Sequence, residues 1–182
     1  ARGLPGLSRD GIEVSVVVQH RCVVDYRRGC DEQVRDGPAV VARARELALQ
    51  GLYQWLVSGA DGAEIEAHLQ EEESFDKLDR VHLDALLHGC IREAAELDAL
   101  LARHVDRKTS LLSPVEHAVL MIGVYELKHC IDIPYRVAIN EGVELAKSFG
   151  GTDGHKYVNG VLDKAAADLR PVEIEAARAA RR

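Results

Sequence analysis

Residues 113–127, SPVEHAVLMIGVYEL, contain the strongest structural signal in this sequence. The segment begins like a helix, because Ser113 suits the N-cap, Pro114 suits the first helical position and Glu116 completes a capping box. The residues that follow are apolar on most sides of a helix rather than along one stripe. A helix that is apolar all round is buried. We therefore expect this segment to form the central helix of the fold.

Other helices are predicted on both sides of this segment. Apolar residues recur at helical spacing in residues 39–59, in a short segment after Asp61, in residues 77 to about 102 and in residues 135–151. A last helical segment is capped by Thr152 or Asp153 and ends at Arg170. No strand is expected in this part of the chain. The sequence therefore predicts an all-α domain, residues 39–171, whose six helices form two three-helix lobes at residues 39–103 and 112–170.

The last predicted helix contains residues 155–166, HKYVNGVLDKAA. Val158, Val161, Leu162 and Ala165 form its apolar stripe, which is typical of a face in the core. Gly160 lies in the middle of this helix, where glycine costs roughly 1 kcal/mol relative to alanine. We therefore expect a neighbouring helix to approach closely at Gly160.

The two ends of the chain differ from the helical part. Residues 1–38 are rich in turn residues, include a short strand-like run and begin with Ala rather than Met. We interpret them as an irregular N-terminal extension that is poorly ordered, loosely attached or an artefact of the start site. Residues 172–182 are polar and rich in arginine, and we expect a frayed C-terminal tail.

The net charge of −7 is unevenly distributed along the chain. Residues 61–100 contain twelve Asp and Glu against three Lys and Arg, so the rest of the chain carries about +2. A negative net charge argues against a nucleic-acid-binding protein. An acidic lobe beside a neutral or basic lobe nevertheless permits RNA binding on one face.

The cysteines indicate neither a metal site nor a secreted protein. Cys22, Cys30, Cys90 and Cys130 fit no zinc-binding spacing. Cys90 and Cys130 lie in apolar helical runs, where cysteine is usually a small core residue, and a reducing cytoplasm fits this usage. No apolar run approaches the ~18 residues of a membrane span, so we expect no membrane partner.

No catalytic motif is present. The sequence lacks G-x-x-x-x-G-K-[ST], G-x-G-x-x-G and H-E-x-x-H, and its eight histidines are scattered singly. Glu141 and Glu144 share a helix face, but Glu144 is equally placed to pair with Lys147. The sequence therefore predicts a protein that is not an enzyme and has no cofactor or metal. A hydrolase that uses scattered histidines and carboxylates is the weakest alternative.

Two predicted helices combine cations with aromatic rings. Arg43 and Arg45 lie near the start of the first long helix, with Tyr53 further along it, and Lys156 and Tyr157 open the last helix. Such cations neutralise phosphates, and such rings stack on unpaired bases. From spacing alone this is a weak indication of RNA binding, because solvated arginines explain the first pair equally well.

Four segments together resemble the NusB family of bacterial transcription antitermination factors. They are RARELALQGLYQWLVSG, SPVEHAVLMIGVYEL, IPYRVAINEGVELAKSFGG and HKYVNGVLDKAA, and they occur in this order between about Ala42 and Pro171. The resemblance implies an all-α fold of two three-helix lobes and no enzymatic activity. It also implies binding to boxA RNA together with NusE, a small-subunit ribosomal protein, in a complex with RNA polymerase and other Nus factors. The implied role is to suppress premature termination, chiefly on ribosomal RNA operons.

The resemblance also implies particular site residues. The RNA-binding residues that it implies are Arg43, Arg45, Tyr53, Asp153, Lys156 and Tyr157. Glu116 falls where the family meets NusE, in addition to its capping role. Many family members have consecutive basic residues where this chain has GPAVVA, so either some phosphate contacts are missing here or residues 1 to about 40 are not the natural N-terminus. The sequence leaves a homodimer open, and the alternative function is a scaffold for a basic ribosomal protein with incidental RNA contact.

Overall fold

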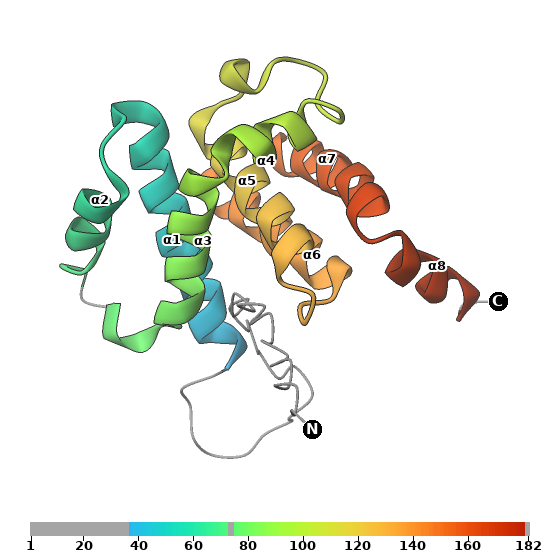
Figure 1. The fold of residues 1–182 in the computed structure, drawn as a ribbon, viewed down its shortest axis with the longest axis horizontal. Coiled ribbons are helices and arrows are strands. Elements are labelled where there is room, and N and C mark those ends of the chain that lie inside the picture. The colour runs from blue at the N-terminus through green and yellow to red at the C-terminus, as the bar shows by residue number, and fades with distance from the viewer. Residues whose placement is uncertain (1–36, 73–74, 181–182) are drawn as a thin grey trace, which may run out of the picture.

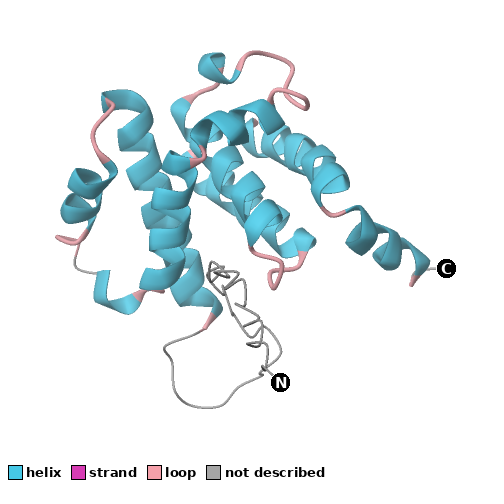
Figure 2. Ribbon diagram, viewed as in Figure 1, coloured by secondary structure: helices cyan, strands magenta, loops and turns pink. Residues whose placement is uncertain are grey.

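The computed structural model describes residues 37–72 and 75–180, and this part of the chain is built from helices without strands (Figures 1 and 2). Its α-helices are α1 (Pro38–Ser58), α2 (Gly62–Leu69), α3 (Arg80–Arg92), α4 (Ala94–Leu101), α5 (Pro114–His129), α6 (Tyr135–Phe149), α7 (Gly154–Leu169) and α8 (Pro171–Ala179). Two short 3-10 helices, η1 (Phe75–Lys77) and η2 (Thr109–Leu111), lie in the connections. The predicted all-α fold is confirmed. The expectations for the N-terminal extension, Cys22, Cys30 and the last two arginines lie outside the described residues.

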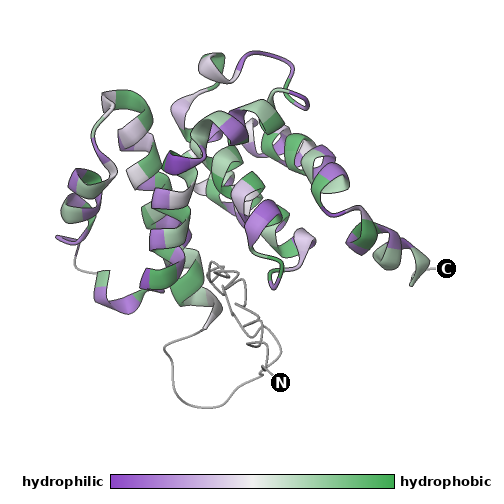
Figure 3. Ribbon diagram, in the orientation of Figure 1, coloured by the Kyte–Doolittle hydropathy of each residue, from purple (hydrophilic) through white to green (hydrophobic). Residues whose placement is uncertain are grey.

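Helix α5 is central, as predicted. It packs against α1 and α3 on one side and against α6 and α7 on the other, and α4 also contacts it. Every residue from His117 to Leu127 is buried. Figure 3 shows hydrophobic and hydrophilic residues alternating along α1, α3 and α7, as expected of surrounding helices with one face in the core. None of the described helices combines the length and apolar character that a membrane span requires.

The start of α5 shows why the chain turns into a helix there. The Oγ atom of Ser113 accepts a hydrogen bond from the backbone N–H of Glu116 at 3.2 Å, and Pro114 occupies the first helical position. The serine cap thus satisfies one of the backbone N–H groups that a helix start leaves without a partner.

Replacing Ser113 with Ala is expected to lower the free energy of unfolding by about 1 kcal/mol, because this capping bond is lost. Chemical denaturation followed by circular dichroism measures the change. Ser110→Ala, an exposed position in η2, is the matched control and should change stability by less than about 0.5 kcal/mol. Equal losses in the two variants would show that the cap has no special role.

Two glycines let α7 approach the central helices. A Cβ atom added to Gly123 of α5 would lie 2.7 Å from Leu162 Cδ2, and one added to Gly142 of α6 would lie 2.9 Å from Leu162 Cδ1. The Leu162 side chain therefore fills the space that a Cβ atom would take at either position, and it would have to shift to admit one. Gly160 has no neighbouring atom in its Cβ direction, so the prediction of a close approach there is wrong.

The predicted helix from Lys77 to about Ala102 is divided into α3 and α4. Glu93 separates them with φ −100° and ψ 12°, and its carboxylate binds Lys128 at 2.8 Å and His129 at 2.7 Å on α5. Leu97 and Leu101 remain buried beyond the break, so the apolar stripe continues although the helix does not. The helix boundary at Glu93 follows from its contacts with α5, and the spacing of apolar residues along the sequence does not predict such contacts.

The predicted frayed tail is wrong over most of its length, because residues 171–179 form α8. Ile174 of this helix is buried. The preceding residue, Arg170, is also buried and donates hydrogen bonds to the carbonyl oxygens of Leu127 at 2.6 Å and Cys130 at 2.8 Å, at the end of α5. A cation at a helix C-terminus compensates the partial negative charge there, so Arg170 attaches the last helix to the core.

Candidate nucleic-acid interface

The start of α7 and the loop between α4 and α5 bring together three interacting side chains. Tyr157, in the first turn of α7, donates a hydrogen bond from its hydroxyl to Asp106 Oδ1 at 3.0 Å. Arg107 donates two hydrogen bonds to the same carboxylate, from Nε at 2.8 Å and from a terminal nitrogen at 3.0 Å. Its guanidinium carbon lies 5.4 Å from the centroid of the Tyr157 ring, a cation–π distance. The ring is therefore held in place by a bond at its hydroxyl and a cation at its face.

Three further residues adjoin this group. Lys156 donates a hydrogen bond to Asp153 at 2.8 Å, and both side chains are more than 70% exposed. Glu116, from the first turn of α5, lies against the first residue of α7, because a Cβ on Gly154 would be 2.9 Å from its carboxylate oxygen. We call this set the α7 cluster: Asp106, Arg107, Glu116, Asp153, Lys156 and Tyr157.

The protonation states in the α7 cluster follow from these contacts. Hydrogen bonds from Arg107 and Tyr157 lower the pKa of Asp106 to about 2. Partial burial and the hydrogen bond to Asp106 raise the pKa of Tyr157 above its ordinary value. At neutral pH the carboxylate is ionised and the phenol keeps its proton. The tyrosine therefore presents a neutral ring that lies beside the cation of Arg107.

Each cation of the cluster is already paired with a carboxylate, so an anionic ligand must compete for it. Exposed pairs of this kind contribute little to stability, because water screens them. A phosphate can therefore take the place of Asp153 at Lys156 at small cost. The chemistry that this surface offers is phosphate binding next to an aromatic ring, which is the combination that single-stranded RNA requires.

The predicted residues of α1 lie in a different setting. In Figure 1, α1 begins at the lower edge of the view, whereas α7 begins near the top, beside the loop after α4. Arg43 is partly exposed and donates a hydrogen bond to Glu46 at 2.6 Å. Tyr53 is 45% exposed. Both side chains are accessible to a ligand, but the structure does not bring them into the α7 cluster.

Arg45 requires a correction, because it cannot contact RNA from where the structure places it. Its side chain is 1% exposed and donates hydrogen bonds to Glu126 at 2.8 Å and to Glu141 at 3.2 Å. His82 Nε2 lies 2.9 Å from the same oxygen of Glu126. Arg45 is therefore part of a buried charged centre that joins α1, α3, α5 and α6, and its role is structural.

Asp106 and Arg107 were missed because they lie in HVDRKTSLL, a segment without helical periodicity that reads as a linker. The only signal in that segment was its basic character next to the start of the central helix. Their contact with Tyr157 spans about fifty residues of sequence and depends on how α7 packs.

Comparison with known proteins bears on the family and the fold of this chain. The NusB family model matches residues 42–167. A transcription antitermination protein NusB of Ralstonia nicotianae is 61% identical over 136 residues, which cover 75% of this chain and 88% of that relative. The solved structure of T. maritima NusB matches with a TM-score of 0.65 and 26% identity, covering 74% of this chain and 96% of that one. A chain in the crystal structure of antitermination factors NusB and NusE with dsRNA has a TM-score of 0.64 and 23% identity, covers 72% of this chain and 99% of its own, and supports the fold alone.

Proposed function

The chain belongs to the NusB family of transcription antitermination factors, which are not enzymes, and from this membership we propose how it acts. It binds boxA-type single-stranded RNA together with the ribosomal protein NusE. The resulting complex joins RNA polymerase and other Nus factors in the cytoplasm. There it suppresses premature termination, chiefly on ribosomal RNA operons.

The observation that supports the RNA-binding part is the ring of Tyr157, which Asp106 and Arg107 hold in place, with Lys156 one residue before it on α7. An unpaired base stacks on Tyr157, and the two cations bind the phosphates on either side of that base. Asp106 orients the ring, so less conformational entropy is lost when the base stacks. Asp153, once a phosphate has replaced it at Lys156, accepts a hydrogen bond from the RNA.

Two residues of α1 and one of α5 complete the proposed interface. Arg43 binds a further phosphate, and Tyr53 offers a second exposed ring. Glu116 binds NusE, because a carboxylate suits a basic ribosomal protein. Glu116 lies against Gly154 at the start of α7, so NusE bound there would lie next to the RNA. In this proposal the two proteins hold one RNA strand jointly, and the position of Glu116 supports it.

The alternative is a scaffold that binds a basic ribosomal protein and touches RNA only incidentally. The observation in its favour is the charge of residues 61–100, where acidic residues outnumber basic residues by nine. An acidic surface attracts a basic partner without any specific RNA contact.

Simultaneous replacement of Lys156 and Tyr157 with Ala separates the two functions. With NusE present, we expect RNA affinity to fall at least about tenfold, because a stacking ring and a phosphate contact are lost. Affinity for NusE itself should stay within about twofold of the original. Fluorescence anisotropy of a labelled boxA-type strand and a pull-down of NusE measure the two quantities.

Lys147→Ala is the matched control for this experiment. Lys147 is also exposed and paired with a carboxylate three residues earlier, Glu144 at 2.7 Å, but it lies near the end of α6. We expect RNA affinity to change less than about threefold, as for a distant cation. If RNA recruitment persists in the double variant, the scaffold function is correct and the RNA-binding role is not.

A further inference from the structure

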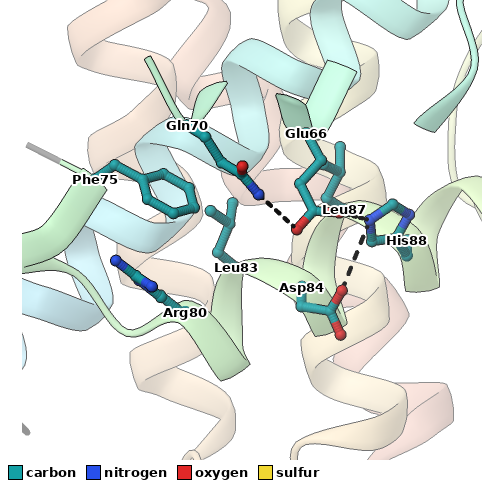
Figure 4. A pocket seen from close by; sticks show the side chains of 8 residues that line it. All are labelled: Glu66, Gln70, Phe75, Arg80, Leu83, Asp84, Leu87 and His88. Carbon is teal, nitrogen blue, oxygen red and sulfur yellow. Dashed lines mark hydrogen bonds and ion pairs between the residues drawn. The ribbon is translucent and has the colours of Figure 1, made fainter. Parts of the chain in front are cut away.

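A pocket between α2 and α3 brings together three side chains that commonly bind metal ions (Figure 4). Glu66 comes from α2, whereas Asp84 and His88 lie one turn apart on α3. One ligand atom from each of the three lies within 4.8 Å of the other two. The cavity has a volume of about 150 Å³. Its remaining lining residues are Gln70, Phe75, Arg80, Leu83 and Leu87.

The distances between the ligand atoms suit a small divalent cation. His88 Nε2 lies 2.8 Å from Glu66 Oε2 and 3.7 Å from Asp84 Oδ1. Atoms bound to Zn²⁺ at about 2.0–2.2 Å in tetrahedral geometry are roughly 3.3–3.5 Å apart. Both carboxylates are at least one-third exposed, so small side-chain rotations reach this geometry without moving the helices.

The surroundings orient two of the three ligands. His88 Nδ1 lies against the start of α2, 3.1 Å from where a Cβ on Gly62 would be, so Nε2 is the nitrogen that faces the carboxylates. Gln70 donates a hydrogen bond to the other oxygen of Glu66 at 3.5 Å. The hydrogen bond from Gln70 is of the kind that fixes ligand orientation in metal sites.

The charges around the pocket also favour a cation. Among the described residues that line the pocket, Arg80 is the one Lys or Arg, and its guanidinium is bound to Asp76 and lies 4.9 Å from the centroid of the Phe75 ring. Figure 4 shows it pointing away from Asp84 and His88. The surrounding segment, residues 61–100, is strongly acidic. A divalent cation therefore meets a negative potential here.

We propose that Glu66, Asp84 and His88 bind one Zn²⁺ ion, with water as the fourth ligand. One imidazole and two carboxylates suit Zn²⁺ better than Mg²⁺ or Ca²⁺, which prefer oxygen ligands alone. The ion replaces the direct contact of His88 with Glu66 and joins α2 to α3. Since α2 is a short helix at the edge of the fold, the bound ion stabilises its attachment. This site is separate from the α7 cluster and does not depend on the proposed RNA binding.

Titration of the full chain with ZnCl₂, followed by calorimetry and thermal unfolding, tests the proposal. We expect one saturable site from this pocket and a midpoint temperature that rises with Zn²⁺ concentration, because the ion binds the folded state. His88→Gln should weaken this site at least tenfold and abolish the rise in midpoint. The variant should unfold like the original protein in EDTA, since it loses only a partly exposed pair.

His129→Gln is the matched control. His129 Nε2 lies 2.7 Å from Glu93 and has a similar exposure to His88, but that carboxylate also binds the ammonium of Lys128. One carboxylate shared with a lysine should not hold Zn²⁺, so this variant should bind like the original chain. Any Zn²⁺ binding by histidines and cysteines elsewhere in the chain is the same in both variants. Unchanged Zn²⁺ binding and an unchanged rise in midpoint in His88→Gln would overturn the proposal.

Discussion

Replacing Glu126 with Ala should lower the free energy of unfolding by about 3–5 kcal/mol. Glu126 is 1% exposed, and one carboxylate oxygen accepts a hydrogen bond from Arg45 at 2.8 Å and lies 2.9 Å from His82 Nε2. Without this carboxylate, the Arg45 guanidinium stays in the core and loses its most buried counter-charge. A buried charge that loses its partner is among the most costly changes in a protein interior. Urea denaturation followed by circular dichroism measures the loss.

Two comparisons isolate this effect. Glu144→Ala removes an exposed carboxylate that pairs with Lys147 and should cost less than about 0.5 kcal/mol. Replacing both Arg45 and Glu126 with Met removes the charges together, and this should restore much of the stability that Glu126→Ala loses. A loss below about 1 kcal/mol in Glu126→Ala would contradict a charged centre at this position.

The same centre should make the fold sensitive to acid. Burial raises the pKa of Glu126, but the charge of Arg45 and the hydrogen bonds from His82 and Arg45 outweigh burial, so the pKa lies below its ordinary value of 4.5. A lowered pKa in the folded state means that the carboxylate adds stability above pH 4.5. This contribution is lost as the pH falls through the folded-state pKa. The Arg45→Met/Glu126→Met variant should therefore lose less stability below pH 4.5 than the original chain.

Replacing Tyr157 with Ala should weaken binding of boxA-type RNA, with NusE present, by about 1–3 kcal/mol, or roughly 5- to 150-fold. The ring supplies the stacking surface of the α7 cluster, and alanine removes all of it. Tyr157→Phe keeps the ring and loses only the hydrogen bond to Asp106, so we expect a loss below about fivefold. Fluorescence anisotropy at one fixed salt concentration measures the RNA affinity of the original protein, Tyr157→Ala and Tyr157→Phe.

Tyr135 provides a matched control for this substitution. It lies at the start of α6, with the guanidinium carbon of Arg136 5.5 Å from its ring centroid, which resembles the arrangement of Arg107 and Tyr157. Tyr135→Ala should leave RNA affinity within about twofold, because this ring is not part of the α7 cluster. Equal losses for Tyr135→Ala and Tyr157→Ala would mean that the RNA does not bind at the α7 cluster.

The central helix could be predicted because its signals are local. The cap at Ser113, the proline at the first helical position and the apolar run after them lie within fifteen residues, and the structure shows the same helix start and burial. The division at Glu93 could not be predicted, since no Gly or Pro marks it and its carboxylate binds residues of α5. Contacts between distant segments decide that boundary.

The candidate site shows the same limit. Lys156 and Tyr157 could be proposed from the sequence because they lie together at a helix start, whereas Asp106 and Arg107 join them only through the packing of α7. Arg45 was misassigned because arginine usually lies on the surface. A signal against this was present, since Val41 and Leu49, four residues before and after it, are apolar and share its helix face. Its partner Glu126 likewise lies within an apolar helix, and a charge there indicates a buried pair.

A salt series with labelled boxA-type single-stranded RNA, the full chain and NusE tests the central claim most directly. We expect saturable binding at low salt, and the logarithm of the affinity should fall linearly with the logarithm of the salt concentration, because phosphate contacts release counterions. Lys156→Ala should reduce the magnitude of this slope by about 1. Absence of RNA binding at low salt with NusE present would contradict the claim that this chain is an RNA-binding antitermination factor.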